Sequence, residues 1–330
     1  MTDDIRTNEP PSRMGRLSRR SVLLAGTGGL TVVAAVGLSG PAAAQGEASG
    51  RPTRTPREEA AVSLYAVSLA DDRRGPLIRP YRGVVTVEPA DRRVATAALE
   101  LLLAGPGDDV LEEGSISAIP EGISVVSADL GDDGTVRVEL SGDLLGADVT
   151  GELADRLTTP AAGQDGSAED RVRRLRLAQI VFTMTQFETI TAVNLVVDGE
   201  PVAVTDFLGN AIEGPVTRDA FEDVTPLILI EQPLPGETIE AKFTVSGTAN
   251  TFEASLFLRL TTEDGEVLLD EPIQATSGSG TRGTFEASLM VPGGTSTGPV
   301  TLLGYEASAR DGSEVNLFEV PLQFDNEEAG

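Results

Sequence analysis

The hexapeptide TFEASL occupies 251–256 and recurs at 284–289, each time after a stretch rich in Gly and Thr. In both copies Phe, Ala and Leu alternate with polar residues. Successive side chains of a β-strand point to opposite faces, so this alternation predicts a strand with one buried and one solvated side. We therefore expect both copies to be strands, with Phe252 and Phe285 supplying bulk to a core.

Further strand patterns surround the two copies, separated by the turn clusters EDG, SGSG, PGG and RDG. They lie at 227–230, 242–247, 267–269, 300–307 and 317–324. About seven short strands at this spacing predict an all-β, immunoglobulin-like sandwich over 226–324. We expect Gly247 and Gly283 near strand ends, where a Cβ would obstruct a tight turn or bulge.

The amino-acid sequence of this region resembles that of a known family. The matching segments are PLPGETI at 233–239, VSGTANTFEASL at 245–256, SGSGTRGTFEASL at 277–289 and SARDGSEVNLFEVPL at 308–322. Together they resemble the immunoglobulin-like domain found beside bacterial spore-germination modules. The resemblance covers about a hundred residues in the right order.

Residues 62–223 mix strands with helices, which predicts an α+β domain with a mixed sheet and two helices. Strands are expected at 62–68, 84–87, 123–130, 135–140 and 192–197, and helices at 92–104 and 170–187. Asp91 is the expected N-cap of the first helix, and Gly105 followed by a proline ends it. Ser167 and Asp170 form a capping-box pattern at the start of the second helix.

The turn GDDG joins two of these strands and predicts a hairpin. Asp132 and Asp133 in this turn are alternatively calcium ligands, but no loop of the D-x-D-x-D-G type surrounds them, which favours a turn role. Residues 142–168 have little apolar periodicity, and we expect most of them to be a mobile insertion.

This domain also resembles a known family. The segments are LYAVS at 64–68, ALELLLAGP at 98–106, AIPEGISVVS at 118–127, VRVELSGDL at 136–144, AQIVFTMTQF at 178–187 and VNLVVDGEPV at 193–202. Their order is similar to that of the GerMN domain of sporulation and germination proteins. The resemblance implies an envelope module similar to the ring-building domains of secretion and sporulation channels. It offers no catalytic motif to match, and the insertion and the acidity depart from it.

The composition excludes several kinds of chemistry. The 330 residues include no His, Cys or Trp. Catalytic Ser/His/Asp and Cys/His systems therefore lack a member, and the usual zinc, haem and iron–sulfur ligand sets cannot form. An enzyme built from this chain would depend on carboxylates, Tyr, Ser/Thr, Arg or its single lysine, Lys242. We expect no cofactor, no metal and no enzyme activity.

The chain is strongly acidic, with 52 acidic against 25 basic residues. Such a surface repels nucleic acid and anionic lipid, so neither is an expected partner. Solvation alone can explain the charge. The alternative hypothesis is adaptation to high salt, because acids are abundant, aromatics are few, and nearly all bases are Arg.

The N-terminus has the pattern of an export signal. SRRSVLLAG at 18–26 puts paired arginines ahead of an apolar stretch that closes with PAAAQG. This resembles a twin-arginine signal peptide, 1–44, cleaved after Ala44, with an uncleaved membrane anchor as the alternative. A lipid-anchored lipoprotein is excluded because the chain has no Cys. Residues 45–61 are the expected tether, and 325–330 an acidic tail.

One basic cluster stands out, on the second predicted helix. It consists of Arg171, Arg173, Arg174 and Arg176. We interpret it as a possible interaction patch for an anionic partner, and pairing with acids of the same chain is the favoured alternative.

The leading functional hypothesis is an exported, non-enzymatic protein of the cell envelope that binds or assembles with a protein or cell-wall polymer. It has no membrane span after signal cleavage. A second hypothesis is a glycan hydrolase that uses two carboxylates, although the few aromatic residues offer little surface for stacking sugars. A third, resting on fold analogy, is an exported protease inhibitor.

Overall fold

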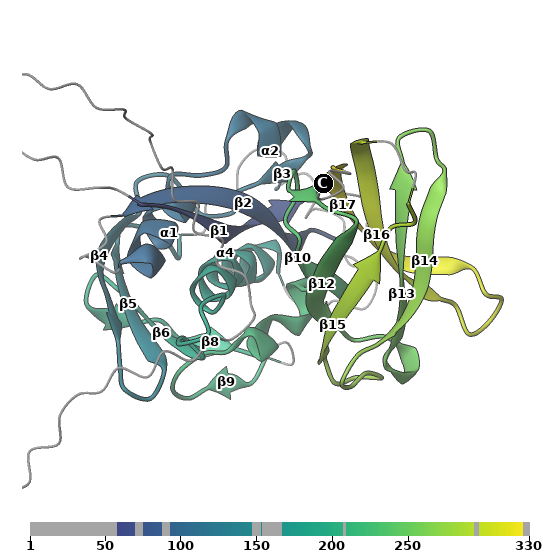
Figure 1. Ribbon diagram of the computed structural model, residues 1–330. Helices are drawn as coiled ribbons and strands as arrows, with labels where there is room; N and C mark the ends of the chain where they lie inside the picture. Colours follow the sequence, from purple (N-terminus) through teal and green to yellow (C-terminus); the bar gives the residue numbers. More distant parts are fainter. Residues whose placement is uncertain are drawn as a thin grey trace, which may run out of the picture. The chain divides into compact units, whose positions relative to one another are not determined.

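The fold is that of a computed structural model (Figure 1). The structure describes residues 58–69, 75–87, 93–146, 153, 167–206, 209–293 and 297–325. The signal peptide, Asp91, most of the tether, most of the 142–168 insertion and the last five residues of the acidic tail lie outside these ranges. Residues 58–61, expected to end the tether, belong instead to the first strand, Glu58–Ser68, because they pair with a neighbouring strand. The described residues of the α+β and all-β regions belong to one compact unit.

The α+β region contains two main sheets. A three-stranded sheet has the order β2-β1-β3, and a four-stranded sheet has the order β4-β5-β6-β7. Their strands are β1 (Glu58–Ser68), β2 (Leu77–Val87), β3 (Ser115–Ile116), β4 (Ser124–Leu130), β5 (Thr135–Ser141), β6 (Ala192–Val197) and β7 (Glu200–Pro201). The second sheet is mixed, as expected, because β4 and β5 are antiparallel whereas β5 and β6 are parallel. A two-stranded ladder of β8 (Val204–Thr205) and β9 (Ala211–Ile212) follows.

Two long helices pack with these sheets, α1 (Val94–Leu103) and α4 (Ala168–Met184), together with a short helix, α2 (Asp108–Glu112). Both long helices contact β1 and β2 as well as each other. The capping box at the start of α4 is present, since Ser167 Oγ accepts from the amide of Asp170. Helix α1 instead has Arg93 as its N-cap, without a side-chain hydrogen bond. Gly105 follows α1 with φ 86°, the left-handed conformation typical of a helix stop.

The hairpin turn between β4 and β5 holds Asp133 in a local role. Its carboxylate accepts a hydrogen bond of 3.0 Å from the amide of Thr135. This bond lowers the pKa of Asp133 and is the usual way an aspartate stabilises its own turn. Within the described ranges, no three His, Cys, Asp or Glu side chains are grouped so as to hold a metal ion.

The C-terminal region is an all-β sandwich of the immunoglobulin-like kind. One sheet has the order β10-β12-β15, and the other has the order β11-β17-β16-β13-β14. The strands are β10 (Ile228–Gln232), β11 (Thr238–Ile239), β12 (Lys242–Ala249), β13 (Ser255–Thr262), β14 (Val267–Gln274), β15 (Gly283–Met290), β16 (Gly298–Ala307) and β17 (Glu314–Phe324). Buried apolar side chains form one continuous cluster that runs through both regions of the chain.

The two TFEASL copies differ, which corrects the expectation that both are strands. The second copy lies in β15, and Phe285 is 4% exposed. The first copy begins with a 3-10 turn, η2 (Phe252–Ala254), and only its last two residues enter β13. Phe252 is 57% exposed and adds nothing to the core. The first copy lies where the chain passes from β12 in one sheet to β13 in the other, so it cannot continue as a strand.

The expectation for Gly247 is confirmed by its surroundings. It pairs with Ile230 beside the irregularity in the β10–β12 ladder, and with Phe285 on its other side. A Cβ there would collide with the carbonyl oxygen of Leu229 and lie 3.0 Å from the Phe285 ring. Gly283 begins β15, and a Cβ on it would collide with the backbone of Ser277. Both positions therefore require glycine for space rather than for a positive φ.

A candidate functional site at the joint of the two regions

The α+β region and the sandwich meet through a 3-10 segment, η1 (Arg218–Val224). This short connection is packed. Phe221 is 0% exposed and Thr225 is 1% exposed, and the Thr225 hydroxyl donates to the carbonyl of Phe221 at 2.7 Å. Because Ala220, Phe221 and Val224 are buried, one side of η1 is packed into the protein, unlike a loop that runs over the surface.

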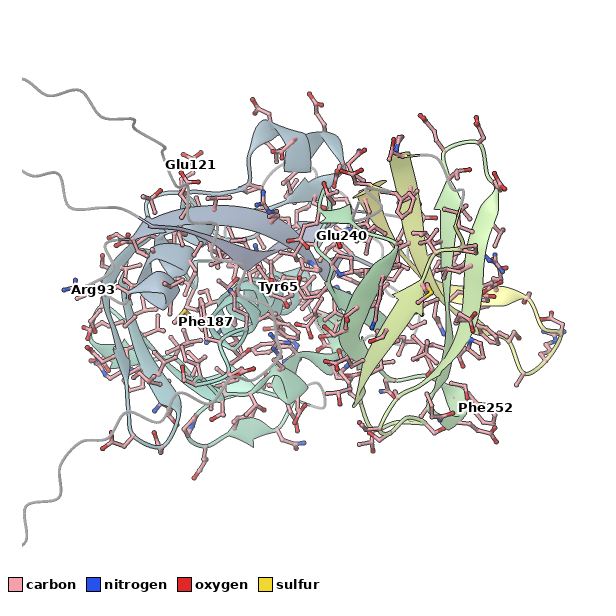
Figure 2. All side chains as sticks on the ribbon, in the orientation of Figure 1. Tyr65, Arg93, Glu121, Phe187, Glu240 and Phe252 are labelled. Carbon is pink, nitrogen blue, oxygen red and sulfur yellow. The ribbon has the colours of Figure 1, made fainter. Side chains whose placement is uncertain are left out.

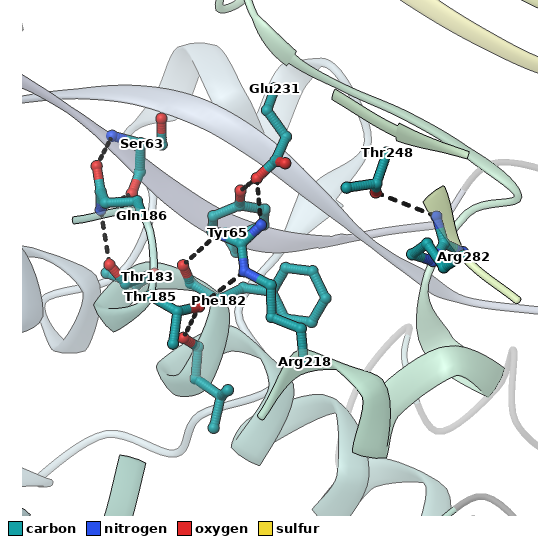
Figure 3. Close-up of polar contacts among 11 residues, drawn as sticks. Ser63, Tyr65, Phe182, Thr183, Thr185, Gln186, Arg218, Glu231, Thr248 and Arg282 are labelled. Atoms are coloured by element: carbon teal, nitrogen blue, oxygen red, sulfur yellow. Dashed lines mark hydrogen bonds and ion pairs between the residues drawn. The ribbon is translucent and has the colours of Figure 1, made fainter. Parts of the chain in front are cut away.

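A polar cluster lies at this joint and draws on both regions (Figure 3). Tyr65 of β1 donates its hydroxyl hydrogen to Glu231 of β10 at 2.5 Å. Arg218 of η1 donates to the same carboxylate oxygen, also at 2.5 Å. The carboxylate thus joins β10 to η1, which is near it in sequence, and to β1, which is far from it. Charge-assisted hydrogen bonds of this kind are stronger than neutral ones.

Arg218 also connects η1 to the C-terminal end of α4. Its Nε donates to the hydroxyl of Thr185 at 2.7 Å, and one terminal nitrogen donates to the carbonyl of Phe182 at 3.2 Å. The guanidinium lies 4.7 Å from the centre of the Phe182 ring and 5.7 Å from that of Tyr65. A cation between two aromatic rings and a carboxylate is held in one orientation, so it specifies how these elements meet.

The environment fixes the charge states of the cluster. Burial raises the pKa of Tyr65 well above its usual value, and the negative charge of Glu231 raises it further. Burial alone would lower the pKa of Arg218, but attraction to Tyr65 and Glu231 raises it overall. The phenol therefore stays neutral and donates, while the guanidinium stays charged. The folded state keeps the Tyr65 proton more firmly than the unfolded state does. The stability that the protonated Tyr65 hydroxyl contributes therefore declines only as the pH rises above about 10.

A second ion pair secures η1 to the sandwich. Arg282, in the loop before β15, donates to both carboxylate oxygens of Glu222, at 2.7 and 2.9 Å. It also donates to the carbonyl of Pro226 at 2.8 Å, and Asn250 donates to Glu222 at 2.8 Å. Two parallel bonds between a guanidinium and a carboxylate restrict rotation as well as distance. With Glu231 and Arg282 in place, the joint is held at two separate points.

A third contact joins the two regions at strand β2. Arg79 donates to the backbone carbonyl of Glu319 in β17, and its guanidinium lies 5.3 Å from the centre of the Phe318 ring. Burial lowers the pKa of Arg79, against the effect of Glu113 and Glu319, which raise it. The joint therefore involves β17 as well as β10 and η1.

The basic cluster predicted on the second helix lies on α4, and its members contact the rest of the same chain. Arg176 is only 3% exposed. Its guanidinium donates to the backbone carbonyls of Ala118, Leu144 and Gly146, at 2.8, 3.0 and 2.8 Å. A buried guanidinium with three carbonyl partners stabilises the loops that it touches.

The other three arginines are half-buried. Arg174 forms an ion pair with Asp223 of η1 and lies 5.5 Å from the ring centre of Phe221. Arg171 and Arg173 each donate a hydrogen bond of 2.9 Å to a backbone carbonyl outside the helix. Arg174 therefore supports the joint from the side of α4. Charge reversal at Arg173 is the substitution that tests an interaction patch here with the least disturbance of the fold.

The joint residues themselves were missed by sequence reasoning. Tyr65 lies in an apolar strand, and Glu231 follows the apolar run LILI. A lone polar or charged residue at the end of a buried strand is a weak signal for a buried ion pair. Nothing in the sequence indicates that Arg218, among 25 basic residues, is the partner. Among the helices of the described ranges, none has the length and apolar character of a membrane span.

Comparison with known families gives two matches, one on each side of the joint. Residues 63–203 match the family Germane, described as "Sporulation and spore germination". Residues 227–313 match the family Gmad2, described as "Immunoglobulin-like domain of bacterial spore germination". Tyr65 falls within the first match, Glu231 and Arg282 fall within the second, and η1 lies between them. No curated protein sequence matches the chain.

Three solved structures are similar in parts. The tandem GerMN domains of the sporulation protein GerM from Bacillus subtilis are 16% identical with a TM-score of 0.33, covering 71% of this chain and 62% of that one. The first GerMN domain of the same protein is 21% identical with a TM-score of 0.29, over 48% and 97%. A putative lipoprotein from Clostridium perfringens is 20% identical with a TM-score of 0.26, over 51% and 93%. The chain thus spans about 62% of the tandem-domain structure.

Proposed function

The chain carries a sporulation and spore germination domain followed by an immunoglobulin-like domain of bacterial spore germination, and we propose that it is an exported, non-enzymatic protein of the cell envelope. In this proposal it acts by binding or assembly, and its partner is a protein or a cell-wall polymer. Its working parts are the surfaces of the two domains.

The observation that carries the proposal is the polar joint. Three elements from both domains converge on the Glu231 carboxylate, and Arg282 holds η1 by a bidentate ion pair. Partly buried ion pairs of this kind contribute little net stability but favour one arrangement over others. A protein that fixes two domains in one orientation is suited to present two surfaces together, which is what a bridging component of an assembly requires.

Crosslinking in living cells, followed by mass spectrometry, tests this proposal. We expect the full chain to be recovered with a defined envelope partner. Arg218→Ala leaves the Glu231 carboxylate without its ion pair, and we expect it to reduce partner recovery. Arg137→Ala is the matched control, because Arg137 pairs with Glu139 on the exposed surface of β5. Equal recovery from both variants would argue against a role for the joint.

A turnover assay tests the non-enzymatic part of the proposal. The purified protein is incubated with peptidoglycan, and soluble fragments are measured. We expect no fragments above the level of a heat-treated sample. Fragment release that disappears when a single acid is replaced by its amide would establish a carboxylate hydrolase instead.

Export by the twin-arginine route is tested with the paired arginines of the signal. Replacing Arg19 and Arg20 with lysine is expected to leave the chain in the cytoplasmic fraction, whereas the unaltered chain is recovered outside it.

Adaptation to high salt is a separate proposal, supported by the excess of 52 acidic over 25 basic residues. A rise in melting temperature from low to molar salt supports it, and a fall ends it.

A further inference from the structure

The solvent side of the five-stranded sheet carries a group of apolar side chains across neighbouring strands. Phe257 of β13 lies opposite Pro272 of β14 on one side and Tyr305 of β16 on the other. The rings of Phe257 and Tyr305 are stacked, with centres 5.1 Å apart and planes 15° apart. Phe257 is half-buried, whereas Tyr305 is only 6% exposed and has the Arg259 guanidinium 4.7 Å from its ring centre, so Phe257 is the member of the pair that reaches solvent.

The exposed phenylalanine of the first TFEASL copy lies at the edge of this face. Phe252 is 57% exposed, and Leu317 of β17 is 54% exposed. One carboxylate connects their neighbourhoods, because Glu306 accepts from the amide of Phe252 at 2.9 Å and from the side-chain amide of Asn316 at 2.7 Å. Phe252 and Leu317 therefore belong to the same corner of the sandwich. Figure 2 labels Phe252 at this end of the domain.

The turn that carries Phe252 is strained and yet firmly held. Glu253 and Ala254 both have positive φ, 53° and 58°, which L-residues rarely adopt. The amide of Glu253 donates to the hydroxyl of Ser279 at 3.0 Å, and its carbonyl accepts from Gln274 at 2.7 Å. Strain that the surroundings over-determine is typical of sites where one side chain must be presented in a fixed position. Such pre-organisation lowers the entropic cost of binding.

The charge around this apolar group is strongly one-sided. Residues 251–259, 270–274 and 305–317 carry or flank these apolar side chains, and they contain six acidic residues against two basic ones, Arg259 and Arg310. Arg259 is already paired, with Asp270 at 2.7 Å and Glu314 at 2.7 Å. A partner that covers the apolar group must therefore bring positive charge to the rim, since a neutral or acidic one would leave the carboxylates without compensation.

We propose that this face, formed by Phe252, Phe257, Pro272 and Leu317 with Tyr305 buried beneath them, docks a protein surface that has an apolar pocket and a basic rim. Phe252 is the anchor that enters the pocket, as exposed aromatic residues do at the centres of interfaces. This inference rests on the proposed function, because it names the surface and the partner class through which a binding protein would act.

Site-specific photo-crosslinking in living cells tests the inference. The full chain carries benzoyl-phenylalanine at position 252 or 317 in two test proteins, and at position 290 or 84 in two controls. Met290 is 69% exposed in the other sheet of the sandwich, and Val84 is 45% exposed in the α+β domain. All four positions are exposed, so the probe is tolerated, and unchanged melting temperatures verify this. We expect a protein adduct with a basic surface from positions 252 and 317 at about ten times the yield from 290 or 84.

Substitutions then distinguish the contribution of the Phe252 anchor from that of the acidic residues around it. Phe252→Ser is expected to reduce the adduct formed from position 317 about tenfold, the effect of truncating an aromatic anchor, while Met290→Ser leaves it unchanged. Glu253→Lys is expected to reduce the adduct as well, by opposing the basic rim. An adduct with glycan, with an acidic or neutral protein, or with a second copy of this chain overturns the inference. Adducts from 290 or 84 alone also overturn it but leave the proposed function standing, whereas no adduct from any position contradicts both.

Discussion

The two copies of TFEASL have the same six residues and different structures. In the second copy the segment is a regular strand of β15, and Phe285 is buried against Gly247. In the first copy the Phe points to solvent and the next two residues have positive φ. The local sequence is identical, so the difference comes entirely from what surrounds each copy. Strand propensity depends on the neighbouring strands and faces, and here this dependence decides the conformation.

The approach to the second copy helps to hold the first copy in its turn. Gly278 and Ser279 precede β15, and the amide of Ser279 donates to the carbonyl of Thr251 at 2.9 Å. A Cβ on Gly278 would lie 2.5 Å from both the amide nitrogen of Ala254 and the carbonyl oxygen of Thr251. The loop therefore packs directly on the first copy's backbone and satisfies groups that a strand ladder would otherwise satisfy.

The largest expected effect is the difference in the free energy of unfolding between variants of the two phenylalanines. Phe285→Ala removes a buried ring and leaves a cavity beside Gly247, so we expect a loss of about 3–5 kcal/mol in the free energy of unfolding. Phe252→Ala, the matched substitution in the other copy, is expected to change it by less than about 0.5 kcal/mol. Urea unfolding followed by circular dichroism measures both. Similar losses from the two variants would show that Phe252 is buried in solution.

The next effect tests the loop that supports the turn. Gly278→Ala places a Cβ against the backbone of the first copy, and we expect a loss of about 1–3 kcal/mol because backbone atoms cannot move aside as side chains can. Gly293→Ala is the control, since no atom lies within 4 Å of a Cβ at that position. Thermal unfolding measures both variants. An unchanged melting temperature for Gly278→Ala would mean that the loop does not hold the turn.

The fold was largely predictable because its signals are local. Alternation identified the strands of the sandwich, and Ser167 with Asp170 marked the start of α4. Extended matches to two families fixed the order of the domains. The first TFEASL copy was the exception, because its conformation depends on the crossing between two sheets and on a loop more than twenty residues away, which no local pattern encodes.

The joint was not predictable for a related reason. Tyr65, Arg218 and Glu231 are separated by more than a hundred and fifty residues in all, and each belongs to a common residue type in an unremarkable setting. The basic cluster on α4 was visible in the sequence, but the burial of Arg176 depends on carbonyls from two distant loops. The burial and the bonding of such residues depend on partners that are distant in the chain, and a single sequence does not show which residues those partners are.

A smaller effect comes from the first residue of each copy. Thr251 is 1% exposed, and its hydroxyl has no hydrogen-bond partner among the described residues. Thr251→Val keeps the shape and removes the unsatisfied group, so we expect a gain of about 1 kcal/mol. Thr284 is exposed, with its hydroxyl 3.3 Å from that of Thr276, so Thr284→Val is expected to be nearly neutral. A loss of stability in Thr251→Val, measured by urea unfolding, would indicate a buried water that bonds this hydroxyl.

The smallest expected effect has opposite signs in the two copies. Glu253 has φ 53°, so Glu253→Gly removes the strain of a left-handed L-residue, and we expect a gain of about 0.5–1 kcal/mol. Glu286 is an exposed residue of β15 opposite Ser246. Glu286→Gly only adds flexibility to the unfolded chain, so we expect a loss of stability of similar size. Both substitutions remove the same charge, so its effect on an acidic chain largely cancels in the comparison. Melting temperatures that move in the same direction would show that charge, rather than backbone conformation, distinguishes the two copies.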